Sequence, residues 1–325
     1  MAPKKQSRKR PAASISSVEP PPAAPPAAPP AWVEEQLADA SQVELVEWAM
    51  HMTMLLVDDL KATAAKMGRN GTINLWCDFA GTASEAFAAR HIEEVLTANG
   101  IFQDIQFRVY LACDNDTSCR EFIKVNHQPR FTANDAMARD FGTGILKTET
   151  GDITMPRGGI DIYVACFPCG PFSSRGKRLG LCDKNGMYYA RAIDTIAHMK
   201  PATYVMENVC TLTHKKAGEE TSNFDVITEA SKNRLPDFDI CTVTKIDPTH
   251  TGHCQRKPRL LQLGVRGDIA PQGLLAQKCD RLLKNPLPIA KNYRQFLNLK
   301  NTHNAWHRFN CFPEYEESIA LKSTG

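Results

Sequence analysis

The sequence predicts an α/β protein built on a doubly wound, mostly parallel sheet. With 325 residues, 42% of them hydrophobic, the chain can bury a substantial core. From residue 71 onward, short runs rich in β-branched and aromatic residues alternate with helical segments, as in parallel sheets whose strands are joined by helices. Strands are expected at 73–79, 105–112, 160–165, 203–206, 238–246 and 260–265, and helices at 84–98, 117–125, 188–199 and 223–232. Ligands bind such sheets at the carboxyl ends of the strands, so functional side chains should follow the strands directly.

Residues 1–31 are expected to form a disordered tail. They hold five lysines and arginines against one acid, Glu19, and residues 20–30 are all proline or alanine. Such a stretch has nothing to bury and forms an extended spacer. Its basic run fits a nuclear-import signal, a loose electrostatic tether or simply a solvated tail. A nuclear protein is predicted, with the cytoplasm as the alternative.

Residues 32–70 have a helical pattern. Ser41 to Glu44 fits a capping box, and Leu45, Trp48 and Met52 begin an apolar stripe at helical spacing. This stripe should pack on the folded core, and a partner-binding helix is the alternative.

The charge and cysteine content limit the classes of protein. The net charge of the tail is +4 and that of the whole chain is +3, so the rest of the chain is close to neutral. Any phosphate contacts there must come from local clusters of basic residues. Eleven irregularly spaced cysteines in a chain of this length favour reduced thiols. No apolar run has bilayer length and the start lacks the apolar region of a signal peptide, so a soluble intracellular protein is expected.

The first two strands end in residues suited to a nucleoside-containing ligand. Phe79 to Ser84 forms a small-residue turn between strand and helix, which lets a ligand approach the backbone or simply serves packing. Asp114 closely follows the second strand, where an acid commonly binds a ribose hydroxyl. Asp116 better suits the start of the next helix. Farther on, Gly151-Asp152-Ile153 could place a carboxylate near an adenine amino group.

A cysteine-containing segment follows the strand at 160–165. It reads Cys166-Phe167-Pro168-Cys169-Gly170-Pro171-Phe172-Ser173, and Pro168 would fix the direction of the neighbouring thiol. Half a zinc site is one reading, but no second cysteine pair follows at zinc spacing, so no metal is expected. A dithiol redox pair is another, and it stays open. Residues 174–178 add a basic, phosphate-facing loop.

Acidic and basic residues flank the next strands. Glu207 and Asn208 close the strand that begins at 203, and a carboxylate in the same cleft as a thiol suits acid–base chemistry. Gln255, Lys257 and Arg259 lead into a later apolar strand, where cations could hold phosphates or a polarised base carbonyl.

Taken together and in this order, these motifs resemble the C5-cytosine-specific DNA methyltransferases. The resemblance runs from about residue 73 to 266 and implies the Rossmann-like fold of S-adenosylmethionine-dependent methyltransferases, with the catalytic domain at 71–270. Its most specific elements are Phe167-Pro168-Cys169-x-x-Phe172-Ser173 and Glu207-Asn208-Val209. The supporting elements are Phe79-x-Gly81, Asp114 and Asp116 with Asn126 beyond, Gly151-Asp152-Ile153, and Gln255-x-Lys257-x-Arg259.

The resemblance also implies a role for each residue. Cys169 would add to carbon 6 of cytosine, with Glu207 at N3, Asn208 holding the motif and the target base, and Arg259 at O2. S-adenosylmethionine would be the cofactor, bound by Phe79, Gly81, Thr82, Asp114, Asn115, Asp152, Ile153 and Pro168. DNA would be the substrate, contacted by Ser173, Arg175, Lys177, Arg178, Gln255 and Lys257 and presented by base extrusion. One branch of the family modifies tRNA, which is the alternative substrate.

The sequence departs from the family pattern in four places. The turn at Gly81 has fewer glycines, Gly170 stands where glutamine is usual, and Lys257 replaces an arginine and so loses its bidentate fork. Residues 271–325 are expected to be a short extension, a truncated recognition region whose lead-in resembles 287–297, without the closing Gly-Asn motif. A partner protein could supply target recognition, and a catalytically weak binding or regulatory protein is the third functional hypothesis.

Overall fold

The computed structural model describes residues 71–98, 105–173, 179–215, 218–248 and 257–284. The predicted tail, the predicted helix within 32–70 and the basic loop 174–178 lie outside these residues. None of the described helices is both long enough and apolar enough to span a membrane.

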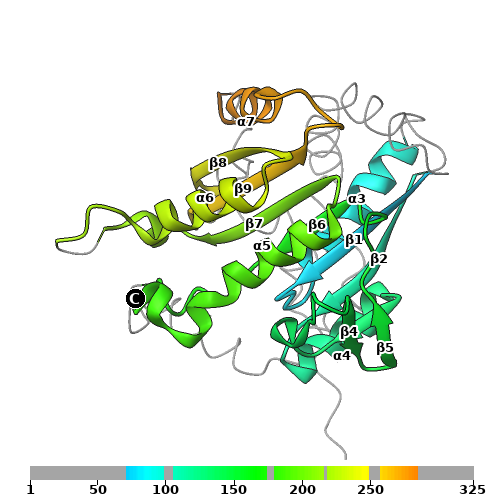
Figure 1. Cartoon of the computed structure of the whole chain (residues 1–325). Coiled ribbons are helices and arrows are strands. Elements are labelled where there is room, and N and C mark those ends of the chain that lie inside the picture. The colour runs from blue at the N-terminus through cyan, green and yellow to red at the C-terminus, as the bar shows by residue number, and fades with distance from the viewer. Residues whose placement is uncertain (1–70, 99–104, 174–178, 216–217, 249–256, 285–325) are drawn as a thin grey trace, which may run out of the picture. The chain divides into compact units, whose positions relative to one another are not determined.

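A seven-stranded sheet forms the centre of the fold (Figure 1). Its order is β3-β2-β1-β6-β7-β9-β8, and the five strands from β3 to β7 run parallel. β9 is antiparallel to both of its neighbours. The strands are β1 (Thr72–Asp78), β2 (Gln106–Cys113), β3 (Phe131–Ala133), β6 (Ile162–Ala165), β7 (Thr203–Val209), β8 (Phe238–Ile246) and β9 (Arg259–Arg266). The predicted doubly wound, mostly parallel sheet is confirmed.

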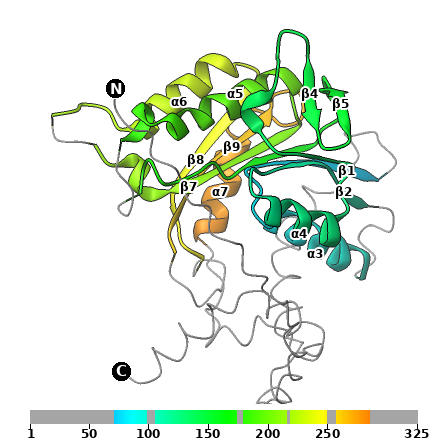
Figure 2. The same ribbon diagram turned by 90° about the horizontal axis from the view of Figure 1, so that it is seen from below.

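Helices cover both faces of this sheet, as Figure 2 shows. On one face lie α3 (Ser84–Ala98) and α4 (Thr117–His127), and on the other lie α5 (Tyr188–Met199) and α6 (Asn223–Arg234). A further helix, α7 (Leu274–Lys284), packs against β8 and was not predicted. Alternation along β1 supplies both cores: Leu75 and Cys77 pack with α3, while Trp76 packs in the larger cluster with α5 and α6.

Local capping fixes where the helices begin. Asp116 caps α4 by accepting from the backbone N–H groups of Ser118 and Cys119, which confirms its expected place at a helix start. Ser222 and Asp225 form a reciprocal capping box at α6. α4 ends at His127, and Gln128 caps it with a left-handed φ of 47°.

A two-stranded hairpin stands apart from the main sheet. It consists of β4 (Ile145–Thr148) and β5 (Gly151–Thr154), paired antiparallel. The backbone N–H of Glu149, at its tip, donates to the carbonyl of Thr132 at 2.9 Å, which places the tip beside β3. The remaining connections include four 3-10 turns, namely η1 (Ala136–Ala138), η2 (Gly180–Cys182), η3 (Lys184–Met187) and η4 (Cys210–Thr213).

Candidate active site

The turn between β1 and α3 has an unusual backbone. Phe79, Gly81 and Ala83 all have left-handed φ angles, of 55°, 54° and 51°. A non-glycine residue in this conformation costs on the order of 1–3 kcal/mol, so the surrounding contacts must hold the turn in place. Such strain is concentrated at ligand-binding and catalytic sites.

Asp114 provides one of those contacts. Its Oδ2 accepts from the backbone N–H of Gly81 at 2.8 Å, and its Oδ1 accepts from that of Asp116 at 2.9 Å. The end of β2 is thereby joined to the turn after β1, as the sequence predicted for two parts of one site. An ionised carboxylate has about four acceptor positions, so Asp114 can still bind ribose hydroxyls.

The space around Gly81 fits a ligand that lies close to the backbone. A β-carbon built on Gly81 would meet nothing within 4 Å. Beside it, the ring of Phe79 contacts Tyr188, with 5.1 Å between ring centroids. An open backbone, a carboxylate and an aromatic surface together suit the nucleoside and methionine parts of S-adenosylmethionine.

Cys169 lies on a tight turn just beyond β6. Its carbonyl accepts from the backbone N–H groups of Phe172 and Ser173, at 2.9 and 2.8 Å. Phe167 and Phe172 are buried on either side, whereas Pro168, Cys169 and Gly170 are exposed. The two phenylalanines anchor the segment and present the thiol to solvent, where a substrate can reach it.

Asn208 holds the cysteine segment to the next strand. It is almost completely buried at the end of β7, and its Nδ2 donates to the carbonyl of Phe167 at 2.8 Å. Its Oδ1 accepts from the backbone N–H of Val209 at 2.9 Å. The side chain thus bonds to the backbone at two neighbouring strand ends and joins the segment that bears Cys169 to β7.

Glu207 and Arg259 form an ion pair at the same edge. Val209 pairs with Arg259 across β7 and β9, so Glu207 and Arg259 lie diagonally on one face, with the Arg259 Nε 2.6 Å from the Glu207 Oε1. Burial raises the pKa of Glu207 above its usual value, although the charges of Arg259 and Lys257 lower it. A carboxyl group balanced in this way can both accept and donate a proton.

Cys166 differs from Cys169 although only two residues separate them. It is half-buried, and burial raises the pKa of its thiol to about 12, with the charges of Glu85 and Glu207 adding to the effect. A thiol of this kind is a poor nucleophile at neutral pH. No group of three or more potential metal ligands occurs among the described residues.

The other predicted site residues fall into three groups. Thr82 and Asn115 are exposed beside Gly81 and Asp114, Ser173 is half-buried beside Cys169, and Lys257 is exposed ahead of Arg259. Asp152 and Ile153 lie on β5 of the separate hairpin, not at the end of any strand of the seven-stranded sheet. Arg175, Lys177, Arg178 and Gln255 lie outside the described residues.

The structure places an acid that the sequence reasoning missed at the end of β3. Asp135 follows this strand by two residues and caps η1 by accepting from the backbone N–H of Met137 at 2.7 Å. The backbone N–H of Asp114 donates to the carbonyl of Ala133 at 3.1 Å, so the ends of β2 and β3 are adjacent. Asp135 went unnoticed because β3, at three residues, is too short to produce a strand pattern.

A second missed feature is the buried ion pair of Asp78 and Arg139, directly beneath the turn. Both side chains are fully buried. Asp78 also accepts from the Trp76 Nε1 at 3.0 Å and the Tyr163 hydroxyl at 2.7 Å, and Arg139 donates to Thr195 at 2.8 Å. Burial opposes the charge on Arg139, but Asp78 outweighs it and raises the pKa of Arg139. The pair ties the end of β1 to the segment after β3.

Comparisons with known proteins name related methyltransferases. Type II methyltransferase M.PspPI of Psychrobacter sp. (strain TA137) is 28% identical over 121 residues, which cover 37% of this chain and 28% of that protein. Type II methyltransferase M.NlaIV of Neisseria lactamica is 42% identical over 65 residues, covering 20% and 14%. The chain therefore spans less than a third of the length of these curated relatives.

Solved structures similar to this chain include two proteins from eukaryotes. The DNMT2 mutant of Spodoptera frugiperda is 15% identical with a TM-score of 0.40, over 62% of this chain and 52% of that one. The Dnmt2 methyltransferase of S. pombe is 13% identical with a TM-score of 0.37, over 60% and 50%.

The model of the family "C-5 cytosine-specific DNA methylase" matches residues 98–320, about two thirds of the sequence. This match includes the strand ends that carry Asp114, Cys169, Glu207 and Arg259. The resemblance predicted from the sequence is therefore confirmed, and the chain belongs to the C-5 cytosine-specific DNA methylase family.

Proposed function

We propose that this chain transfers a methyl group from S-adenosylmethionine to carbon 5 of cytosine in DNA, through a covalent adduct with Cys169. One observation carries the proposal. Asn208 links the strand end bearing Glu207 to the turn bearing Cys169, so an exposed thiol and a half-buried carboxyl are fixed to adjoining strand ends. The open turn after β1 lies at the same edge of the sheet.

Cys169 supplies the nucleophile that cytosine needs. Carbon 5 of cytosine is a poor nucleophile until a thiolate adds to carbon 6, so the Cys169 thiol loses its proton to solvent and forms an Sγ–C6 bond. Carbon 5, now enamine-like, takes the methyl group, while the S–CH3 bond of the sulfonium donor breaks and leaves a neutral thioether. Loss of the carbon 5 proton to solvent restores the C5–C6 double bond, and the Sγ–C6 bond breaks to release Cys169.

Glu207 and Arg259 act on the opposite edge of the base. Addition at carbon 6 places electron density on N3 and O2, where a proton from Glu207 and the charge of Arg259 stabilise it. The N3 proton returns to Glu207 as the adduct breaks down and the cytosine ring is restored. The raised pKa of Glu207 favours this role, because more of the group is protonated near neutral pH than in an ordinary glutamic acid.

S-adenosylmethionine, the methyl donor that this family uses, would lie across the ends of β6, β1, β2 and β3. Phe79, Gly81, Thr82 and Pro168 would contact its methionine side, with Asp114 and Asn115 at the ribose. By strand order the adenine would reach the end of β3, which favours Asp135 over the predicted Asp152 and Ile153 as its neighbour.

Nucleic-acid contacts stay a proposal based on the sequence. Ser173, Arg175, Lys177, Arg178, Gln255 and Lys257 would bind phosphates around the extruded base. A nuclear location and a partner protein for target recognition likewise remain proposals.

The test uses methyl transfer with a labelled donor. The full chain is incubated with S-adenosylmethionine carrying a tritiated methyl group and with either duplex DNA or tRNA, and Cys169→Ala serves as the control. We expect label in DNA cytosine and none with the variant. Methyl transfer that survives in the variant would contradict the covalent mechanism. Methyl transfer to tRNA alone would show that tRNA, and not DNA, is the substrate.

A second measurement detects the adduct itself. A DNA oligonucleotide containing 5-fluorocytosine cannot lose its substituent at carbon 5, so a covalent complex should accumulate with the unaltered chain. Cofactor binding without transfer to either polymer, and without this complex, would support a regulatory protein instead.

A further inference from the structure

The turn that receives the cofactor is held by a third anchor, His127, at the end of α4. Its Nε2 lies 3.1 Å from the carbonyl oxygen of Thr82, which is 45 residues earlier in the chain. A carbonyl oxygen only accepts hydrogen bonds, so the Nε2 must carry the proton. This bond joins α4 to the middle of the strained segment from Phe79 to Ala83.

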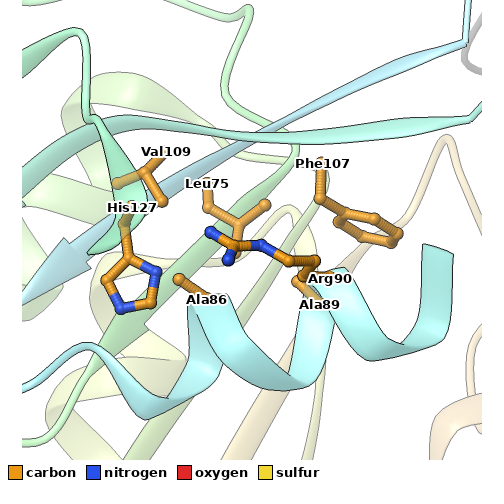
Figure 3. A pocket seen from close by; sticks show the side chains of 7 residues that line it. All are labelled: Leu75, Ala86, Ala89, Arg90, Phe107, Val109 and His127. Atoms are coloured by element: carbon orange, nitrogen blue, oxygen red, sulfur yellow. The ribbon is translucent and has the colours of Figure 1, made fainter. Parts of the chain in front are cut away.

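The surroundings of His127 fix its ring. The side chain is 8% exposed and lies edge-on to Phe87, with 4.3 Å between ring centroids. The ring lines a small cavity of about 30 Å³. Figure 3 shows His127 together with Leu75, Arg90 and Val109, which also line it. A ring confined in this way has little freedom to release the Thr82 carbonyl.

The same surroundings favour the neutral form of the ring. Burial lowers the pKa of His127, and the charge of Arg90 lowers it further, although the bond to Thr82 opposes them. Arg90 is the charged residue among those that line the cavity, which come from α3, α4, β1 and β2. The Nδ1 is buried and has no hydrogen-bond partner among the described residues, so a proton placed there would be unpaired.

The three anchors hold three peptide groups of the turn, those joining Phe79 to Ala80, Ala80 to Gly81 and Thr82 to Ala83. The backbone N–H of Ala80 donates to the carbonyl of Cys113 at 3.1 Å, that of Gly81 donates to Asp114, and the carbonyl of Thr82 accepts from His127. The first two anchors are Cys113, the last residue of β2, and Asp114, which follows it. The third comes from α4 and acts closest to Ala83. Unlike a glycine, Ala83 has a β-carbon, which makes its left-handed conformation unfavourable.

We propose that His127 is a positioning residue for the cofactor: through the Thr82 carbonyl it holds the turn in the conformation that binds S-adenosylmethionine. This inference rests on the proposed cofactor site. His127 does not touch the reacting atoms. Its loss should weaken cofactor binding because the free turn would relax out of its strained conformation before each binding event.

The test compares variants that separate the hydrogen bond from the packing. His127→Phe keeps a buried ring and removes the donor, His127→Gln keeps an N–H donor, and Phe122→Leu perturbs the same aromatic cluster without contact to Thr82. The dissociation constant of S-adenosylmethionine is measured for each full-length variant by isothermal titration calorimetry. Thermal unfolding is followed in parallel.

We expect His127→Phe to weaken binding about tenfold, which corresponds to the loss of one hydrogen bond, and His127→Gln to recover most of it. Phe122→Leu should lower the melting temperature but leave the dissociation constant within about twofold. Equal affinity in His127→Phe and the unaltered chain would overturn the proposal, since packing alone would then explain His127.

Hydrogen exchange separates this inference from the proposed function. The backbone N–H of Ala83 should exchange faster in His127→Phe than in the unaltered chain, without any cofactor present. Unchanged exchange refutes the anchoring role. If exchange rises but the unaltered chain binds no S-adenosylmethionine, the cofactor site fails while the anchor stands.

Discussion

Asn208 donates a hydrogen bond from its Nδ2 to the carbonyl of Phe167 at 2.8 Å, two residues before Cys169. Replacing Asn208 with alanine leaves that buried carbonyl without its donor, at a cost of about 1–3 kcal/mol in the free energy of unfolding. The cysteine turn also loses its link to β7. A displacement of about 1 Å at a reacting group costs on the order of 100-fold in rate.

The expected result for Asn208→Ala is therefore a roughly 100-fold slower covalent trapping of a 5-fluorocytosine oligonucleotide. Asn74→Ala is the matched control, because Asn74 also donates to a backbone carbonyl, that of Gly159, but from near the start of β1. Its trapping rate should stay within about twofold. Equal slowing in both variants would show a general loss of stability.

The two thiols of the Cys166–Cys169 pair should behave differently. Cys169 is exposed, whereas burial raises the pKa of Cys166 to about 12. Iodoacetamide should therefore alkylate Cys169 first, as peptide mass spectrometry can measure. Cys166→Ala should still form the adduct with 5-fluorocytosine DNA, while Cys169→Ala should form none. An adduct that depends on Cys166 would reopen the dithiol reading.

The pH dependence should follow Glu207. Its pKa lies above 4.5 because of burial, so the protonated form, which would assist N3 in the proposed mechanism, declines as the pH rises through the folded-state value. Arg259 lowers that pKa, and Arg259→Gln should move the inflection to higher pH. The free energy of unfolding should depend on pH in the same direction. Because the folded chain binds this proton more tightly than the unfolded chain, the stability that Glu207 contributes falls as the pH rises from 4.5 through the folded-state pKa.

The titration can be measured even if Arg259→Gln is inactive. Nuclear magnetic resonance of the Glu207 carboxyl carbon reports the pKa directly, and Arg266→Gln, at the far end of β9, is the control. A shift to lower pH in Arg259→Gln would contradict the electrostatic argument.

The buried pair Asp78–Arg139 should be essential for stability. Arg139→Met removes one partner and leaves the Asp78 charge buried, which costs about 3–5 kcal/mol. Chemical denaturation would measure this loss. Arg266→Ala breaks an exposed ion pair with Asp268 and should cost less than about 1 kcal/mol. Similar losses in the free energy of unfolding for the two variants would contradict this, since they would mean that water solvates the charge of Asp78.

Asp135 and Asp152 are the two candidates for the carboxylate that contacts the adenine of the cofactor, and substitution can distinguish them. Asparagine caps helices as well as aspartate does, so Asp135→Asn should fold normally while losing a charged acceptor. We expect S-adenosylmethionine to bind about tenfold more weakly to Asp135→Asn and equally well to Asp152→Asn. The reverse ranking would restore the residue chosen from the sequence.

The sequence predicted what its local patterns determine. Six of the seven main-sheet strands and helices α3 to α6 follow from periodicity, and Cys169, Glu207 and Asn208 follow from their places just after or at the end of predicted strands. Strand β3 was missed because three edge residues give no pattern. The hairpin of β4 and β5 and the helix α7 were also missed.

Contacts between distant residues could not be read from the sequence. Arg139 lies 61 residues from Asp78, and His127 lies 45 residues from Thr82. No spacing rule connects them, because each pair meets only after the sheet has brought its strands together. The position of Asp135 near the end of β2 likewise could not be predicted, because it depends on the pairing of β3 with β2.

The antiparallel direction of β9 affects how the edge of the sheet that carries Glu207 and Arg259 can change over evolution. Because this strand runs opposite to β7, Arg259 reaches the edge as the first residue of β9, whereas Glu207 reaches it near the end of β7. The cation and the acid therefore belong to separate connections of the chain. Under the proposed function, a change in chain length upstream of Arg259 would move the cation and leave β7, the cysteine turn and their shared hydrogen bond in place.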